Sequence, residues 1–337
     1  MRLRLSIPIL AVLVLLVGPN AIRLSLADTH LDEIRAKAEQ GDANAEGALC
    51  LMYYQDREST HDYHNALKWC RRAAEQGLAE AQYRIAMMYK IGQGTVQDDT
   101  EAALWFRQSA EQGHAEAQYQ LGKMYALGEG VAQDYVEAEK WIRKSAVQGN
   151  VKGQYGLGFL YADGKGVTED YREAAKWFHK AAEQGLAEAQ YNLSVLYYEG
   201  QGVPQDYSES EKWVRKAAEQ GFSWAQNNLG KLYYRGQGVA LNYIEAAKWF
   251  RKAAAQGVAE AQYNLGLIYA RGEGVAAQDY HEAEKWWSKA AAQGNIEAEK
   301  DLKILQAQKR STIEVVAGFT IWAAVGLGIR WLLFGRI

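Results

Sequence analysis

A glycine preceded by glutamine returns every 36 residues along most of this 337-residue chain. The series is Gly41, Gly77, Gly113, Gly149, Gly185, Gly221 and Gly257, and Gly294 follows one residue late. A tryptophan keeps the same spacing, at Trp69, Trp105, Trp141, Trp177, Trp213, Trp249 and Trp286. A fixed period of this size is typical of repeat arrays, in which each unit stacks on its neighbours. The chain is therefore expected to be a stack of similar units without a single globular core.

Each repeat has the pattern of two helices joined by a glycine loop. In the repeat 113–148 the apolar positions of the first helix share one helical face, and they are Ala117, Leu121, Met124 and Tyr125. Gly128 and Gly130 follow, and we interpret this loop as a helix stop, because glycine adopts the left-handed conformation that ends helices. Asp134 and Glu137 then predict a capping box that begins the second helix.

Two helices per repeat predict an all-α chain folded as an α/α solenoid. A capping helix is expected at 28–41 and another at 295–310, on either side of the array at 42–294. The seven repeats are expected at 41–76, 77–112, 113–148, 149–184, 185–220, 221–256 and 257–293.

The first 27 residues predict a secretory signal peptide. Arg2 and Arg4 precede an apolar run at 5–17, and small residues stand before a cut after Ala27. The run is short for a membrane span. An uncleaved N-terminal anchor is the alternative.

The C-terminal segment 313–335 predicts a transmembrane helix. The stretch 315–334 is apolar except for Thr320 and Arg330, and its length suits one bilayer crossing. Ala324 and Gly328 would let two such helices approach closely, so self-association through this helix is an option. The alternative is a helix that packs on the last repeat or lies at the membrane interface.

The repeats resemble the Sel-1-like repeat family, which is related to the tetratricopeptide repeats. The resemblance covers about 41–305, and one copy, 186–221, shows almost the whole motif: Ala187, Ala189, Gln190, Tyr191, Leu193, Tyr197, Gly200, Gly202, Val203, Asp206, Tyr207, Glu209, Trp213, Lys216, Ala217, Ala218, Gln220 and Gly221. This resemblance implies a right-handed superhelix of about seven repeats that binds proteins or peptides and scaffolds complexes. Bacterial members are often exported and act in envelope signalling or host contact, and a eukaryotic member is a membrane adaptor of protein degradation in the endoplasmic reticulum.

The sequence therefore predicts a non-enzymatic adaptor, exported and held by its C-terminal helix. The expected location is the bacterial inner membrane with the repeats in the periplasm. One alternative is a secreted module that binds a host protein or the cell wall. A less favoured alternative is a β-lactam or peptidoglycan hydrolase, an activity linked to a cysteine-rich branch of the family. This chain departs from that branch, because it has two cysteines and no Ser-x-x-Lys or Lys-Thr-Gly motif.

The two cysteines lie in the first repeat. In an antiparallel hairpin Cys50 should face about residue 66 or 67, which places Cys70 one turn further along. The sequence leaves open whether the two cysteines form a disulfide. The preferred prediction is that both are buried as small hydrophobic side chains without a bond between them.

No residue is predicted to be catalytic, to ligate a metal or to bind a cofactor. His61 and His64 offer two ligands where structural zinc takes four. The net charge of −3 gives no reason to expect binding of nucleic acid, which usually needs a basic face.

A protein or peptide partner is expected to bind along the first helix of each repeat. Counted from the repeat glycine, positions +3, +7, +10 and +14 share one helical face and vary freely between copies. This face would line a concave groove, and exposed apolar residues ringed by charge mark interaction surfaces. Partial burial against neighbouring helices is the equally weighted alternative. The candidate groove residues are Met87, Phe159, Val195, Trp224, Lys231 and Leu267.

Overall fold

The computed structural model describes residues 31–55 and 62–310. The predicted signal peptide (1–27) and transmembrane helix (313–335) lie outside these ranges, so both stay predictions. Within the described ranges no helix is both long enough and apolar enough to span a membrane.

All regular structure in the described ranges is helical, and no strand occurs there, which confirms the all-α prediction. The repeats consist of α3 (Ala43–Gln55), α4 (Tyr63–Glu75), α5 (Ala79–Ile91), α6 (Asp99–Glu111), α7 (Ala115–Leu127), α8 (Tyr135–Val147), α9 (Val151–Asp163), α10 (Tyr171–Glu183), α11 (Ala187–Glu199), α12 (Tyr207–Glu219), α13 (Ser223–Arg235), α14 (Tyr243–Ala255), α15 (Ala259–Arg271) and α16 (Tyr280–Ala291). Further helical residues lie at 31–39 and 296–310. We call the odd-numbered helices from α3 to α15 A helices and the even-numbered ones B helices.

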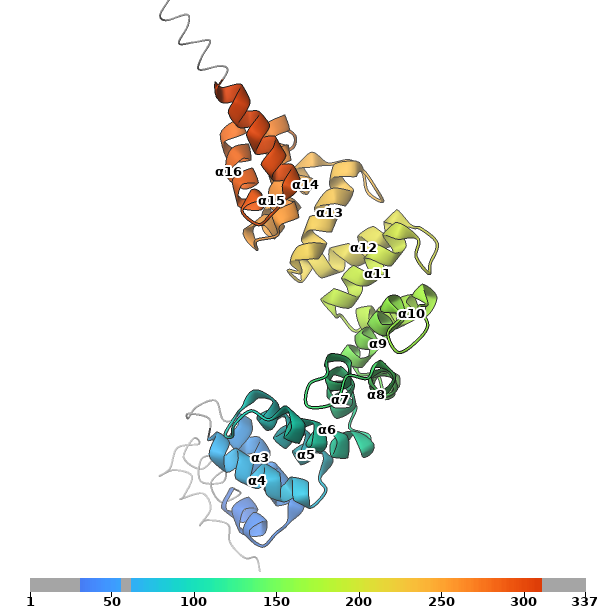
Figure 1. Cartoon of the computed structure of the whole chain (residues 1–337), viewed down its shortest axis with the longest axis vertical. Helices are drawn as coiled ribbons and strands as arrows, with labels where there is room; N and C mark the ends of the chain where they lie inside the picture. Colours follow the sequence, from blue (N-terminus) through green and yellow to red (C-terminus); the bar gives the residue numbers. More distant parts are fainter. Residues whose placement is uncertain (1–30, 56–61, 311–337) are drawn as a thin grey trace, which may run out of the picture. The chain divides into compact units, whose positions relative to one another are not determined.

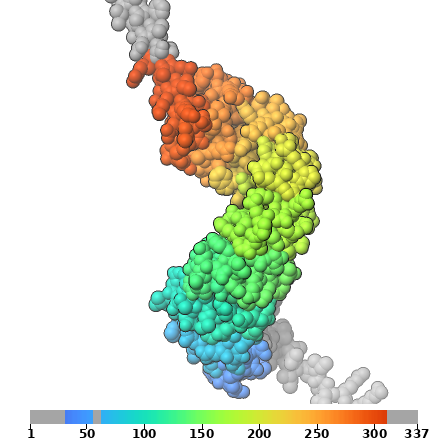
Figure 2. Space-filling model, turned by 45° about the vertical axis from the view of Figure 1, so that its right-hand side comes forward, coloured from blue at the N-terminus to red at the C-terminus, as the bar shows by residue number. Residues whose placement is uncertain are grey.

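The chain divides into two compact units, of which the first ends at Asp170 and the second begins at Tyr171. Inside each unit every helix packs on the helix before it and the helix after it. Figure 1 shows this succession of hairpins, and in Figure 2 the colours within each unit follow one another without mixing. Within each unit, a helix therefore buries its apolar side against the helices next to it in the chain, as the period predicts.

A side-chain cap begins the B helices α4, α6, α8, α12, α14 and α16, as predicted, but the capping box is only half formed, as α12 shows. Asp206 Oδ1 accepts hydrogen bonds from the backbone N–H groups of Ser208 (2.8 Å) and Glu209 (3.0 Å). The N–H of Asp206 itself donates to the carbonyl oxygen of Tyr197 (2.9 Å). The recurring tyrosine of the A helix therefore satisfies the donor that a capping box would leave to Glu209, whose carboxylate pairs with Lys212.

A recurring glutamine joins three helices in the interior. Gln226 Nε2 on α13 donates to the Ala218 carbonyl oxygen at the end of α12 (3.2 Å), and Gln226 Oε1 accepts from Gln256 Nε2 after α14 (2.8 Å). The Ala218 carbonyl oxygen also accepts from the Gly221 N–H (3.1 Å), so the glutamine adds a second donor at the end of α12. The amide–amide bond recurs at Gln82–Gln112, Gln118–Gln148, Gln190–Gln220 and Gln262–Gln293.

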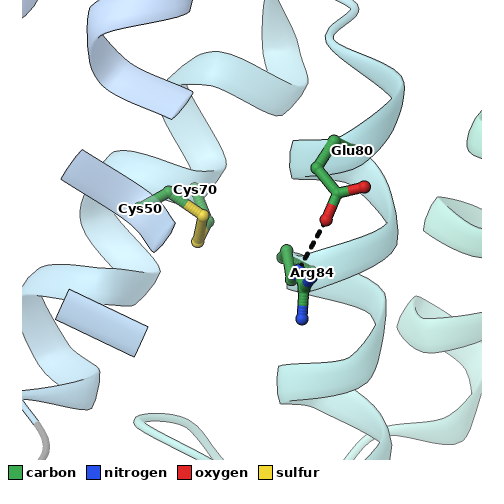
Figure 3. Close-up of a disulfide and its surroundings, with 4 residues drawn as sticks. All are labelled: Cys50, Cys70, Glu80 and Arg84. Atoms are coloured by element: carbon green, nitrogen blue, oxygen red, sulfur yellow. Dashed lines mark hydrogen bonds and ion pairs between the residues drawn. A yellow bond between two sulfur atoms is a disulfide. The ribbon is translucent and has the colours of Figure 1, made fainter. Parts of the chain in front are cut away.

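The two cysteines differ from the preferred prediction, because they form a disulfide between α3 and α4 (Figure 3). Their Cα atoms lie 4.7 Å apart and both side chains are buried. The hairpin register explains the correction. In other hairpins the positions equivalent to Cys50 and Cys70 also face one another: a Cβ added at Gly230 would lie 2.7 Å from Phe250 Cδ1, and the pair Gly122 and Ile142 is similarly close.

Candidate protein-binding groove

The predicted groove residues all lie on A helices, but they do not form one site. Met87 lies on α5 and Phe159 on α9, in the first unit, and Val195, Trp224, Lys231 and Leu267 lie on α11, α13, α13 and α15, in the second unit. Trp224 and Phe159 are the most exposed of the set, at 50% and 48%. The other four are half-buried. The face is therefore exposed at some positions, as a binding groove requires, and partly buried at others, as the alternative predicts.

In the second unit the first pocket, about 280 Å³ in volume, opens between α11, α12 and α13. Val195, Trp224 and Lys231 line it, as a binding face on the A helices requires. Side chains that the sequence analysis missed complete its wall, including Tyr191, Tyr198, Glu199, Ser210 and Val214.

A second pocket of about 410 Å³ lies further along the same unit, between α13, α15 and the start of the helix at 296–310. Lys231 and Leu267 line it, together with the aromatic rings of Tyr234 and Tyr263. Lys231 also lines the first pocket, so the two pockets adjoin at this residue.

A polar bridge separates the two pockets and is held by short hydrogen bonds. Lys231 Nζ donates to Glu260 Oε1 (2.9 Å), and Asn227 Nδ2 donates to Glu260 Oε2 (2.9 Å). Asn264 Nδ2 donates to Asn227 Oδ1 (3.2 Å). Asn227 is fully buried where five other repeats carry a tyrosine at the same position. The bridge therefore fixes the charges of Lys231 and Glu260 side by side in the middle of the groove.

The hydroxyls of Tyr191 and Tyr263 stay protonated at neutral pH, because their pKa values are raised. Burial raises the pKa of Tyr191, and burial together with the nearby carboxylate of Asp301 raises the pKa of Tyr263 to about 12. Tyr263 OH donates to Asp301 Oδ2 (3.2 Å). At neutral pH these side chains are hydrogen-bond donors with apolar rings, which suits them to contact a partner.

In the described part of the first unit, the two cysteines and His114 make structural contacts. Both cysteines are consumed by their disulfide. His114 Nε2 lies 3.0 Å from Glu80 Oε2, and its Nδ1 accepts from the Ala117 N–H to cap α7. Burial alone would raise the pKa of the Glu80 carboxyl, but hydrogen bonds from His114 and Arg84 outweigh burial and lower it.

Figure 3 shows the Glu80–Arg84 pair on α5, apart from the disulfide. His61 lies outside the described residues. Among the residues that the structure describes, no three His, Cys, Asp or Glu side chains gather as a metal site would require.

The arrangement of stacked helical hairpins with side-chain pockets along the A helices defines an α/α solenoid of the repeat-protein class. The family model described as Sel1 repeat matches residues 43–78, 79–114, 115–150, 151–186, 187–222, 225–258 and 259–295. The chain belongs to the Sel1 repeat family. Solenoids of this family generally act as protein-interaction scaffolds and are typically not enzymes.

Solved structures of two bacterial proteins are similar to this chain. One is c5321, a protective antigen of uropathogenic Escherichia coli strains, with 39% identity and a TM-score of 0.77 over 82% of this chain and 59% of that protein. The chain therefore spans less than two thirds of the length of c5321. The other is a Sel1 repeat protein from Oxalobacter formigenes, with 36% identity and a TM-score of 0.66 over 83% of this chain and 80% of that one. No curated protein matches the chain.

Proposed function

We propose that this chain is an exported, membrane-tethered adaptor that binds a protein or peptide along its A helices. The observation that carries the proposal is the adjoining pair of pockets in the second unit, which four predicted groove residues line. Trp224 is half exposed at the first pocket, and a large exposed aromatic beside a pocket is the kind of residue that dominates binding energy.

Trp224→Ala should weaken partner binding by about 2 kcal/mol, or roughly thirtyfold, while the chain folds normally, because half of the indole faces solvent. In-cell crosslinking followed by mass spectrometry would identify the partner, and titration of that partner against the purified full-length chain would give the dissociation constant. Phe159→Ala tests the first unit in the same way.

The matched control is Ile244→Ala, which removes a side chain that is 70% exposed on a B helix of the same unit. The control should leave the dissociation constant unchanged. If Trp224→Ala and Phe159→Ala variants both fold and retain the wild-type affinity, the binding face proposed for the A helices is wrong.

Export is supported by the disulfide, because such bonds persist in oxidising compartments and are rare in the cytosol. The expected location is the periplasmic side of a bacterial inner membrane. Because both cysteines are buried, cells are quenched in acid and the chain is denatured before a thiol reagent is added; Cys50 and Cys70 should then be labelled only after reduction. Labelling without reduction would count against an oxidising compartment.

The tether is supported by the apolar segment at 313–335 and is tested separately. A spanning helix keeps the chain in the membrane pellet after an alkaline carbonate wash, whereas release without detergent would favour a secreted module. The description of c5321 as a protective antigen is consistent with exposure outside the cytoplasm and keeps this second candidate in view. Both candidates share the binding face on the A helices.

A further inference from the structure

The repeats of this chain provide an internal control for each other. Equivalent positions in successive hairpins meet the same packing demand, so the stack requires similar residues at each of them. A buried position at which one repeat departs from the others is therefore not explained by stacking alone. Several such departures occur in the second unit, and they line the same pocket.

The first pocket is built from these departures. Val214 takes a position that five of the six other B helices fill with a larger side chain, Phe106, Ile142, Phe178, Phe250 or Trp287; the sixth carries Cys70. Ser210 replaces an alanine found in every other repeat, at Ala66, Ala102, Ala138, Ala174, Ala246 and Ala283. Ser194 stands where four other A helices carry glycine. Beside these three buried departures lies the exposed Trp224, at a variable position where most repeats carry glutamate. All four residues line the pocket between α11, α12 and α13.

The pocket exists because of the two side chains that face each other across this hairpin. In the next repeat the large ring of Phe250 fills the gap beside Gly230, where an added Cβ would lie only 2.7 Å from the ring. In the repeat that carries the pocket, Ser194 and Val214 occupy the same two positions, and valine is much smaller than phenylalanine. The cavity therefore arises from a particular pair of side chains inside an otherwise regular hairpin.

We propose that this pocket binds one cationic side chain, an arginine or lysine, of the partner protein. This inference rests on the proposed function, because it names the chemistry that the groove would recognise.

The charge of the pocket favours a cation. Its lining carries two carboxylates, Glu199 and Glu260, and one cation, Lys231. Glu260 is paired with Lys231, whereas Glu199 is exposed and has no ion-pair partner among the described residues. One negative charge is therefore left for a ligand to neutralise. An apolar ligand would instead remove water from these carboxylates without replacing their hydrogen bonds, which costs free energy.

The polar atoms and rings of the pocket suit the same ligand. Ser210 is 3% exposed and lines the pocket. A serine hydroxyl can accept a hydrogen bond from the N–H group of a ligand there. Tyr191, Tyr198 and Trp224 line the pocket. Aromatic ring faces attract cations, and tryptophan is the most favourable of them for this contact.

The size of the pocket fits a side chain better than a cofactor. Small-molecule sites occupy about 300 to 1,000 Å³. The first pocket holds about 280 Å³, just below that range. The wider groove has the same charge preference, since carboxylates outnumber cations at the variable A-helix positions of this unit and its final helix: Glu188, Glu199, Glu260, Glu297 and Asp301 against Lys231, Arg235 and Arg271.

Capped tripeptides test the proposal without knowledge of the partner. The probes are acetyl-Gly-X-Gly-amide peptides with Arg, Lys, Leu, Phe or Glu at X, and the readout is saturation-transfer NMR with the full-length chain in a neutral detergent. We expect signals from the Arg and Lys peptides, little from Glu, and a loss of the Arg signal at high salt because an ionic contact is screened.

The decisive variant restores the residues that other hairpins carry. Ser194→Gly with Val214→Phe should fill the pocket, keep the melting temperature close to that of the wild type, and reduce the Arg signal about tenfold, because the site for the cation is lost. Glu199→Gln keeps the pocket open and should reduce the signal about fivefold through loss of one charge. Ile244→Ala is the control for exposed apolar surface and should leave the signal unchanged.

Two results would overturn the cationic site: an Arg signal that persists when the pocket is filled, or a stronger pocket-dependent signal from Leu or Phe than from Arg. The second result would leave the adaptor function intact, because an apolar anchor would then occupy the same groove. The crosslinking experiment with Trp224→Ala decides the adaptor function independently.

Discussion

Replacement of Gly238 by alanine should destabilise the second unit by about 4 kcal/mol. Gly238 has a φ of +71°, and an added Cβ would lie 2.1 Å from the carbonyl oxygen of Tyr207 at the start of α12. The left-handed conformation alone costs alanine about 1 to 2 kcal/mol. The rest arises because the loop must move off the preceding B helix, and forced backbone shifts of this kind cost roughly 1 to 3 kcal/mol.

Gly221→Ala is the matched control for backbone strain. Gly221 has a φ of +93°, but no atom lies within 4 Å of the added Cβ. Its replacement should cost only the conformational part, about 1 to 2 kcal/mol. Urea unfolding gives the two losses, and hydrogen exchange of α12 and α13 shows whether the loss is local to the contact. Equal losses for the two variants would mean that the close approach to Tyr207 contributes nothing.

The same close contact between a loop glycine and a B helix recurs in other repeats. It could not be predicted from the sequence pattern of a single repeat. The second glycine of each loop seats against the previous B helix, and an added Cβ at Gly94, Gly130, Gly166, Gly202 or Gly274 would lie within 2.3 Å of its backbone. The sequence predicted the first glycine of each pair as a helix stop, and Gly236 ends α13 in this way. The second glycine is required by a neighbouring hairpin, a contact that a local pattern cannot reveal.

The period predicted the hairpins well, because helix length and stacking depend on features that repeat. Pairings across a hairpin were harder to predict, since they depend on its rotation. Cys50 was expected to face residue 66 or 67 and is bonded to Cys70. The sequence did contain evidence for this pairing. The equivalent positions in other hairpins pair a small residue with a large one, such as Gly230 with Phe250.

Only part of the candidate groove was predicted, because the pocket also depends on pairings across a hairpin. Variable positions marked the A helices correctly as the location of Val195, Trp224 and Lys231. The floor of the first pocket comes from α12, where Ser210 and Val214 lie at positions that are otherwise filled by core residues. A search restricted to one variable helical face could not find them, whereas a comparison of core positions between repeats would have done so.

In the first repeat, Arg72→Ala should destabilise the hairpin of α3 and α4 by about 3 kcal/mol, because it would leave a buried carboxylate without its cation. Glu46 is fully buried and takes the position of the glutamine that joins three helices in later repeats. Arg72 Nη2 lies 2.7 Å from Glu46 Oε1 and donates to the Ala38 carbonyl oxygen (3.1 Å). Gln76 Nε2 donates to Glu46 Oε2 (2.7 Å).

Glu46→Gln should rescue the Arg72→Ala variant, since the double variant recreates the amide arrangement of the later repeats. There Gln82 Nε2 donates to the Ala74 carbonyl oxygen (3.1 Å), and its Oε1 accepts from Gln112 (2.7 Å). The new glutamine would bond to Ala38 and Gln76 in the same way. A double-mutant cycle in urea should show Glu46→Gln alone within about 1 kcal/mol of the wild type and a coupling of about 2 kcal/mol between the two changes. Additive losses would show instead that Arg72 stabilises the hairpin through packing alone and that the buried carboxylate needs no cation.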